Sequence, residues 1–247
     1  MGLVSHRLPR LFVERELDGH SVTLDERESH YLGHVLRLAR GDELVAFNGR
    51  GAERVATIGS LQRRGAVLEL RTTLAPLAES PLDLTLLQAV PKSDAMDLVV
   101  QKATELGVRT LVPALTEFSV VRLDAERSER RVDHWRKIAR SACEQCGRHR
   151  PPTIAAPLPL NEALAALPAA GARFALDAAA ERALDAQAAP TAGLVIAVGP
   201  EGGFGTSDWR RLDAAEFMRV GLGPRVLRAE TAALAACAIA QSLWGDG

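Results

Sequence analysis

The chain has 247 residues, of which 47% are hydrophobic and 25% charged, and its formal net charge is −1. This is the composition of a globular protein, and the balanced charge excludes a global electrostatic attraction to nucleic acid. No apolar run approaches the roughly 18 residues that span a membrane. Because the N-terminal segment also lacks the pattern of a signal peptide and the three cysteines are an odd number, we expect a cytoplasmic protein without a disulfide framework.

Residues 10–72 show short alternating segments rich in β-branched residues, which predicts strands separated by turns. One helix is expected after Asp25, because Asp25 and Glu28 have the spacing of a capping box. Short strands with one helix predict a small β-barrel, and Thr72–Pro81 has the composition of a linker. The expected strands are "RLFV", "HSVTL", "DELVAFNGRG", "ERVATIGSL" and "GAVLEL", and the helix has an apolar stripe of Leu32, Val35, Leu36 and Leu38.

From Leu82 onward, strand-like and helix-like segments alternate, which predicts an α/β domain with a parallel sheet. The expected strands are "LDLTLLQAV", "RTLVPAL", "ARFALD", "GLVIAV" and "MRVGLG". The expected helices are Asp94–Leu106, Glu129–Cys146, Asp208–Phe217 and Ala229–Leu243.

Two patterns of metal-ligating residues point to packing rather than to a metal. Cys143 and Cys146 both fall on the apolar face of an expected helix, and no second pair of ligands has the spacing of a zinc site. His30 and His34 are four residues apart on a helix, but no third ligand is placed to complete a site. We therefore expect no bound metal.

The segment Gly199–Gly203, with the sequence GPEGG, directly follows a buried strand. It is neither G-x-G-x-x-G nor a P-loop, and no lysine lies near it to hold phosphates. Glycines allow a ligand to approach the backbone closely, and ligands of open α/β sheets bind at the carboxyl ends of strands. The acid Glu201 suits a cationic or hydroxyl-rich ligand.

A second loop, Val220–Leu234, also follows a strand with Gly-x-Gly-Pro and then enters an alanine-rich helix. Arg225 and Arg228 lie near the start of this helix, where the helix dipole disfavours cations. This conflict indicates a site: two glycine–proline loops with an arginine pair suggest a ligand cradle that faces an anionic partner.

Basic residues are concentrated between Arg127 and Arg150, with a second focus at Arg63 and Arg64. A solvated helix face and a stripe that contacts phosphate are both compatible with this density. We favour the solvated face, because acidic residues are interspersed with the basic ones.

The motifs, taken together, resemble those of the SPOUT-class RNA methyltransferases, and specifically the 16S ribosomal RNA uracil-N3 methyltransferases of the RsmE type. The resemblance runs nearly end to end, although Ala95 stands where the family commonly has a basic residue. It rests on "PRLFV", "HYLGHVLRLARGDELVAFNGRG", "MDLVVQKATELGV", "WRKIARSACEQCGR", "VGPEGGF" and "LGPRVLRAETA".

The resemblance implies a PUA-like RNA-binding β-barrel at residues 1–74 and a SPOUT methyltransferase domain at residues 75–247. The SPOUT domain would have a parallel sheet with a C-terminal deep trefoil knot that binds S-adenosylmethionine. The resemblance also implies a homodimer with 16S ribosomal RNA as its partner, in the assembled small subunit or, as the alternative, as free RNA. Neither a membrane nor a metal is expected as a partner.

Site residues follow from matching the family's motifs to this sequence. Arg228 would stabilise the uridine anion, with a salt bridge to Glu230 as the alternative. Glu230 is the candidate base for the N3 proton, and Thr231 would orient either group. The expected cofactor-binding residues are Gly199, Pro200, Glu201, Gly202, Gly203, Leu222, Gly223, Pro224, Val226 and Leu227. The expected RNA contacts are Arg10, Arg37, Arg148 and Arg150, with structural pairing an equal alternative for Arg37.

Two other functions remain open at this point. The first is a SPOUT methyltransferase that acts on transfer RNA or on another ribosomal position, because the motifs fix the methyl donor better than the acceptor. The second is a non-catalytic RNA-binding protein of ribosome assembly that has kept the fold. Binding of S-adenosylmethionine would distinguish the second from an enzyme.

Overall fold

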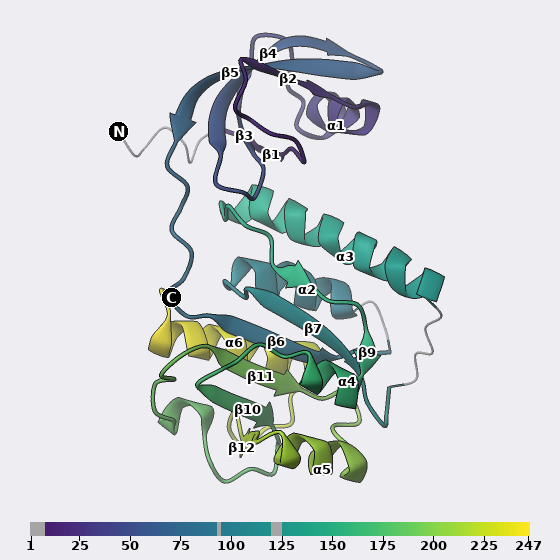
Figure 1. Ribbon diagram of the computed structural model, residues 1–247, viewed down its shortest axis with the longest axis vertical. Helices are drawn as coiled ribbons and strands as arrows, with labels where there is room; N and C mark the ends of the chain where they lie inside the picture. Colours follow the sequence, from purple (N-terminus) through teal and green to yellow (C-terminus); the bar gives the residue numbers. More distant parts are fainter. Residues whose placement is uncertain (1–7, 93–94, 120–124) are drawn as a thin grey trace. The chain divides into compact units, whose positions relative to one another are not determined.

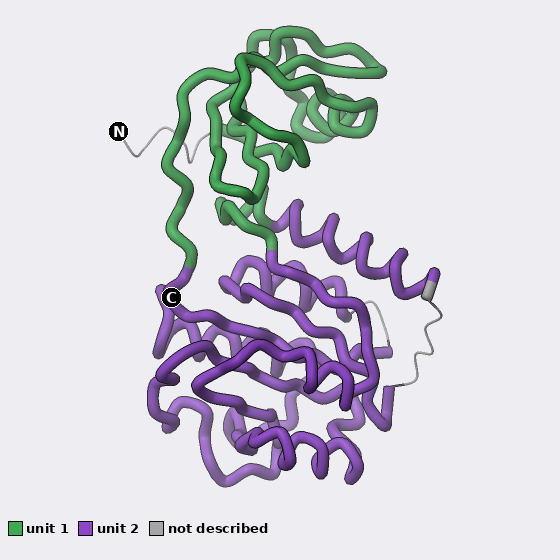
Figure 2. The backbone as a smooth tube through the Cα atoms, viewed as in Figure 1, with its two compact units in different colours: residues 1–79, 143–151 green, residues 80–142, 152–247 purple. Residues whose placement is uncertain are grey.

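The computed structural model describes residues 8–92, 95–119 and 125–247. The chain forms two compact units, which Figure 2 shows in different colours. Unit 1 consists of Met1–Glu79 with Cys143–Pro151, and unit 2 of Ser80–Ala142 with Pro152–Gly247. Unit 1 therefore takes in a segment that a linear division after residue 74 places in the second domain.

Unit 1 is built on a five-stranded sheet that curls over its own core (Figure 1). The strand order is β1-β3-β4-β5-β2, and every pair is antiparallel except the parallel pair β1 and β3. The five strands predicted from alternation are confirmed. Because β5 continues to Leu74, residues 72–74 belong to a strand and not to the predicted linker. The strands are β1 (Arg10–Phe12), β2 (Ser21–Leu24), β3 (Glu43–Phe47), β4 (Glu53–Gln62) and β5 (Gly65–Leu74).

The predicted helix of unit 1 begins with the predicted capping box. The N–H of Glu28 donates to Oδ1 of Asp25 at 2.8 Å, and the N–H of Asp25 donates to Oε2 of Glu28 at 2.8 Å. Helix α1 (Glu26–His30) then continues as the π-helical turn η2 (Tyr31–Val35). Val35 ends this turn and is 59% exposed, so it does not share the burial of Leu32 in the predicted apolar stripe.

Unit 2 is built on a parallel sheet with the order β12-β10-β11-β6-β7-β8, and β9 also pairs with β7. All pairs in this sheet are parallel, as predicted from the alternation of strands and helices. The short strands β8 and β9 were not predicted. The strands are β6 (Leu84–Ala89), β7 (Thr110–Leu115), β8 (Thr153–Ile154), β9 (Leu158–Pro159), β10 (Ala172–Leu176), β11 (Leu194–Val198) and β12 (Met218–Val220).

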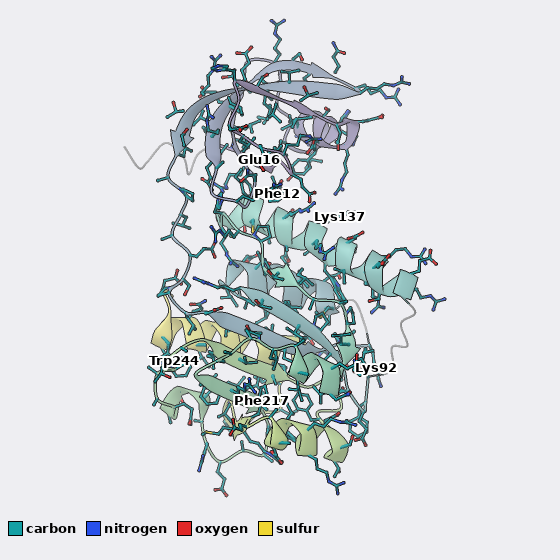
Figure 3. All side chains as sticks on the ribbon, viewed as in Figure 1. Phe12, Glu16, Lys92, Lys137, Phe217 and Trp244 are labelled. Carbon is teal, nitrogen blue, oxygen red and sulfur yellow. The ribbon has the colours of Figure 1, made fainter. Side chains whose placement is uncertain are left out.

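Helices cover both faces of this sheet, which explains why all residues of β6 and β11 are buried. One face packs against α2 (Ala95–Glu105), α3 (Ala125–Cys146) and α6 (Ala229–Trp244), and the other against α4 (Leu160–Ala165) and α5 (Thr206–Ala214). Figure 3 labels Trp244, which packs on the first face, and Phe217, which is buried on the second. Burial of each large apolar side chain in these cores contributes about 1.5–3 kcal/mol.

The four helices predicted for unit 2 are present, although Asp94, the predicted start of the first, lies outside the described residues. Helix α4 and the short 3-10 helix η3 (Leu184–Ala186) are additional. Helix α3 already includes Ala125, four residues before the predicted start. The apolar face predicted at Cys143 is confirmed: Cys143 is buried, as are Val132, Trp135 and Ala139, which recur at helical spacing and are at most 5% exposed. None of the helices in the described part of the chain is long and apolar enough to cross a membrane.

Candidate active site

A pocket of about 150 Å³ lies at the carboxyl ends of β10, β11 and β12, where ligands of parallel α/β sheets bind. Three loops that follow these strands and the first turn of α6 supply its walls. Its lining is largely apolar and backbone. The lining residues are Leu176, Asp177, Ala178, Val198, Gly199, Pro200, Glu201, Gly203, Val220, Leu222, Gly223, Arg225, Val226, Leu227, Ala229 and Ala232.

The loop after β11 is a tight turn whose geometry favours glycine at two positions. The N–H of Gly203 donates to the carbonyl of Pro200 at 2.8 Å, and Gly203 has a left-handed φ of 71°. A methyl group on Gly199 would lie 3.0 to 3.1 Å from backbone atoms of Gly203 and Phe204. The two glycines therefore close the turn and expose its backbone to the pocket.

The loop after β12 is anchored by backbone hydrogen bonds. Gly221 donates to the carbonyl of Arg182 at 2.8 Å and accepts from the N–H of Leu184 at 3.0 Å. Gly223 has φ 100°, and a Cβ atom there would have no neighbour within 4 Å. The backbone at Gly223 thus faces open space at the rim of the pocket.

The structure brings most of the predicted cofactor-binding residues into this one pocket. Gly202 and Pro224 are the exceptions and do not line it. Gly202 faces the ring of Phe118 instead. The predicted residues that line the pocket are Gly199, Pro200, Glu201, Gly203, Leu222, Gly223, Val226 and Leu227.

Glu201 has a defined structural partner. Its Oε1 accepts the backbone N–H of Lys92 at 3.1 Å, which joins the loop after β11 to the segment after β6. Figure 3 labels Lys92 at this edge of unit 2. Glu201 therefore shapes the turn with one oxygen and lines the pocket at the same time.

Asp177, which follows β10, is a pocket carboxylate that sequence reasoning missed. Its Oδ1 accepts the N–H of Ala179 at 2.9 Å, and its Oδ2 lies 3.9 Å from Nη1 of Arg219. The signal that could have found it is its place as the last residue of the predicted strand "ARFALD", at the carboxyl end where ligands bind. Asp177 and Glu201 give the pocket two carboxylates, and Arg225 gives it one cation.

The predicted catalytic residues lie at the start of α6, next to the pocket. Arg228 is the N-cap residue, and its neighbours Ala229 and Ala232 line the pocket. The side chain of Arg228 is exposed and forms no ion pair with any described residue, so the alternative of a salt bridge to Glu230 is not observed. Glu230 is partly buried and Thr231 is exposed.

The predicted RNA-contacting residues all lie in unit 1 and fall into two groups. The guanidinium of Arg10 donates to both oxygens of Glu53, at 2.6 and 3.2 Å, and its side chain is 11% exposed. Arg148, whose side chain is 9% exposed, pairs with Glu79 at 2.6 Å. By contrast, Arg37, with φ 57°, and Arg150 are exposed.

Two of the three cysteines, Cys143 and Cys237, are buried and packed rather than reactive. Burial raises the pKa of the Cys143 thiol to about 12 and that of the Cys237 thiol to about 12. Such thiols stay protonated and poorly nucleophilic near neutral pH. The rings of His30 and His34 stack with centroids 4.3 Å apart, and no group of three metal-ligating side chains occurs among the described residues.

Comparison with known proteins links this pocket to a family. A family model described as an RNA methyltransferase domain matches residues 78–241, which include the whole pocket, and an RNA methyltransferase PUA domain matches residues 24–71. The ribosomal RNA small subunit methyltransferase E of Aquifex aeolicus is 33% identical and aligns over 93% of this chain and 97% of its own. The chain belongs to the ribosomal RNA small subunit methyltransferase E family.

Solved structures of methyltransferases agree with this membership. Ribosomal RNA small subunit methyltransferase E from Neisseria gonorrhoeae, bound to S-adenosyl methionine, is 34% identical with a TM-score of 0.89, over 97% of this chain and 99% of its own. A putative methyltransferase from Legionella pneumophila, in complex with its cofactor SAM, is 32% identical with a TM-score of 0.92, over 98% and 100%.

Proposed function

We propose that the protein is an S-adenosylmethionine-dependent methyltransferase that methylates N3 of a specific uridine in 16S ribosomal RNA. The observation that carries this proposal is the pocket formed by the two glycine–proline loops. These loops are separate in the sequence and meet at the carboxyl edge of the sheet. Structures similar over the whole chain hold S-adenosylmethionine.

The residues of the pocket fit S-adenosylmethionine. The backbone at Gly203 and Gly223, where a Cβ atom would have no neighbour within 4 Å, would offer donors and acceptors for the adenine and ribose, and Gly199 lines the same pocket. The carboxylates of Asp177 and Glu201 suit ribose hydroxyls and a cofactor with a net positive charge. Leu222, Val226 and Leu227 supply apolar surface. Gly202 and Pro224, which do not line the pocket, would contribute by fixing the backbone conformation of the two loops.

S-adenosylmethionine, when bound, supplies an electrophilic methyl group on a sulfonium sulfur. In the overall reaction the methyl group would pass from sulfur to uridine N3, with its bond to sulfur broken, and the N3 proton would be lost to a base. The pyrimidine base must be unpaired for N3 to be reached. Precise orientation of both reactants would supply much of the rate acceleration.

The residues at the start of α6 would assist the loss of the proton. Because the guanidinium of Arg228 is exposed and has no ion pair among the described residues, it is available to stabilise the negative charge on the uridine. Glu230 would accept the N3 proton, directly or through water, and Thr231 would orient one of the two side chains. None of the three lines the pocket, but Ala229 and Ala232 of the same helix start do, which supports the proposal.

The exposed arginines Arg37 and Arg150 are the stronger candidates for contact with RNA phosphates. Arg10 and Arg148 stay in the proposal as positioning residues, because their guanidinium groups are held by Glu53 and Glu79. RNA contact through either of them would require an ion pair to open.

Further properties of the proposal come from the family resemblance. They are a deep trefoil knot in the C-terminal part of the sheet domain, a homodimer, a cytoplasmic location and the assembled small subunit as substrate. The division into a PUA-like domain at 1–74 and a SPOUT domain at 75–247 is part of the same proposal. The parallel sheet and the two family-model matches support it.

The test is the nucleoside composition of 16S ribosomal RNA from cells that lack the protein. We expect 3-methyluridine to be lost, to return with the wild-type gene, and to stay absent with Arg228→Ala. Loss of a different methylated nucleoside would point to another acceptor position. An unchanged profile, or full restoration by Arg228→Ala, would contradict the proposed catalysis.

A further inference from the structure

Phe118 differs from the other aromatic residues of the chain. The six Phe, three Trp and one Tyr of the sequence all lie in the described residues, and nine of these ten side chains are buried or partly buried. Phe118 is 47% exposed. It takes part in no ring stacking or cation–π contact among the described residues. A single exposed apolar side chain is common, so the surroundings of Phe118 decide its meaning.

The ring lies against the glycine loop of the pocket. A Cβ atom on Gly202 would lie 3.4 Å from Cδ2 of Phe118 and 3.6 Å from its Cγ, which is van der Waals contact, so the ring lies directly beside this glycine. The residues on both sides of Gly202, Glu201 and Gly203, line the pocket. Phe118 is thus at the border of the proposed cofactor site: its ring contacts Gly202 and is partly exposed to solvent.

The backbone that carries Phe118 is fixed on both sides. The Ser119 hydroxyl accepts the N–H of Thr116 at 3.0 Å, and the N–H of Ser119 donates to the Thr116 carbonyl at 3.0 Å. The N–H of Glu117 donates to the carboxylate of Asp208, whose side chain is fully buried at the start of α5. These bonds hold the turn in place before any ligand arrives.

The side chain of Glu117 also holds this turn against α5. Its Oε2 accepts from the Ser207 hydroxyl at 2.6 Å and from the Ser207 N–H at 3.2 Å. Hydrogen bonds from the side chain and backbone of Ser207 lower the pKa of Glu117, so it stays a charged acceptor at neutral pH. The backbone that carries Phe118 is therefore already ordered before RNA binds, which lowers the entropy cost of a contact with its ring.

We propose that Phe118 is the surface on which an unpaired base of the RNA substrate stacks when the target uridine reaches the pocket. This inference rests on the proposed function. A base taken out of its own stack loses stacking energy, and a fixed aromatic ring at the pocket border replaces it. Among the described residues, the chain neighbours Thr116, Glu117 and Ser119 are polar, so they add no apolar surface next to the ring. A single ring among polar neighbours fits a base better than a protein interface, which needs a contiguous apolar patch.

The experiment compares the wild-type protein with Phe118→Ala, Phe118→Leu and Phe118→Trp. Binding of a short oligouridylate is measured by fluorescence anisotropy at fixed salt, and binding of S-adenosylmethionine by calorimetry. We expect Phe118→Ala and Phe118→Leu to weaken oligouridylate binding roughly 5- to 100-fold, because Leu is apolar but has no ring. Phe118→Trp should bind as well as the wild type. Cofactor affinity should not change in any variant.

A second measurement uses small ribosomal subunits from cells that lack the protein. Phe118→Ala should raise the KM for subunits more than it lowers kcat. Met218→Ala is the matched control, because Met218 is an apolar side chain, 37% exposed, on the edge strand β12, and its loss should change neither readout.

Three outcomes separate the possibilities. If Phe118→Leu binds oligouridylate like the wild type, stacking is wrong. If Phe118→Ala changes the sedimentation of the protein from dimer to monomer, a second copy of the chain covers the ring and the proposal is also wrong. If the wild type makes no 3-methyluridine but Phe118→Ala still weakens oligouridylate binding, the proposed reaction fails and the stacking surface stands.

Discussion

Nδ1 of His149 lies 3.1 Å from Oε1 of Glu53, and both side chains are 3% exposed. The N–H of Gly51 donates to Nε2 of the same ring at 2.6 Å, so Nε2 carries no proton and Nδ1 donates to Glu53. The same carboxylate accepts two hydrogen bonds from Arg10. Glu53 thus holds β1, β4 and the segment 143–151 together inside unit 1.

Replacing Glu53 should therefore be costly. Glu53→Ala leaves the Arg10 guanidinium and the His149 N–H without their acceptor in a buried place, and we expect a loss of about 3–5 kcal/mol in the free energy of unfolding. Urea denaturation measures it. Glu16→Ala is the control, because the Arg50–Glu16 pair has the same 2.6 Å distance but side chains 55% and 62% exposed, so it should cost less than about 1 kcal/mol. Equal losses would contradict the role of Glu53.

Tyr31 should titrate at unusually high pH. Burial, followed by the charge and hydrogen bond of Glu144, raises its pKa from 10.0 to about 12. Below pH 10 both states hold the phenolic proton. Between pH 10 and 12 the unfolded state releases it first, so the stability from this group falls as pH rises through that window.

Tyr31 is the one tyrosine of the chain, so tyrosinate absorbance reports on it alone. We expect a midpoint near 12 in the folded protein. Glu144→Gln should lower this midpoint but leave it above 10.0, because burial is the larger cause. A midpoint at 10.0 in the wild type would show that the environment described for Tyr31 is wrong.

Gly223→Ala should weaken cofactor binding through the backbone. An alanine at φ 100° is strained by about 1–3 kcal/mol, and the loop would leave the conformation that lines the pocket. We expect roughly 10-fold weaker binding of S-adenosylmethionine by calorimetry. Gly41→Ala carries similar strain at φ 95° in unit 1, also with no neighbour within 4 Å. It should lower stability and leave cofactor affinity unchanged, and a loss of affinity there would refute the local explanation.

Arg228→Ala should abolish most turnover while the cofactor still binds. Removal of one group that stabilises developing charge costs roughly 100- to 1000-fold in kcat. Single-turnover methylation of small subunits and calorimetry with S-adenosylmethionine measure the two effects separately. Arg210→Ala, an exposed arginine on α5, is the control and should be silent. A large loss of cofactor affinity in Arg228→Ala would assign this arginine to the cofactor instead.

The salt dependence of RNA binding should depend on the exposed arginines. Arg37→Gln and Arg150→Gln should each reduce the slope of log affinity against log salt by about 1, because each removes one phosphate contact. Arg148→Gln should instead act mainly on stability, through the loss of its pair with Glu79. If Arg148→Gln lowers the slope and Arg37→Gln does not, the exposure of an arginine in the free protein does not determine whether it contacts RNA phosphates.

Local patterns made the elements of this fold predictable, and long-range pairing limited the prediction. The Asp25–Glu28 capping box is confirmed because its partners are three residues apart, and the two glycine loops were found because their backbone demands are local. The π-helical turn at Tyr31–Val35 leaves no such pattern. The pairs Arg10–Glu53 and Arg148–Glu79 join residues far apart in the chain, so sequence could not separate buried from exposed arginines.

The place of Cys143–Pro151 in unit 1 has a consequence for how the protein is made. Chains emerge from the ribosome N-terminus first. The strands β1 to β5 are therefore translated before Arg148 and His149. Until α3 and the residues after it have been translated, Glu53 lacks its partner His149 and Glu79 lacks its partner Arg148. A nascent chain halted after β6 would contain all five strands of the unit 1 sheet but would lack Cys143–Pro151. Unit 1 would therefore stay incomplete, and accessible to chaperones, until the ribosome has translated Pro151.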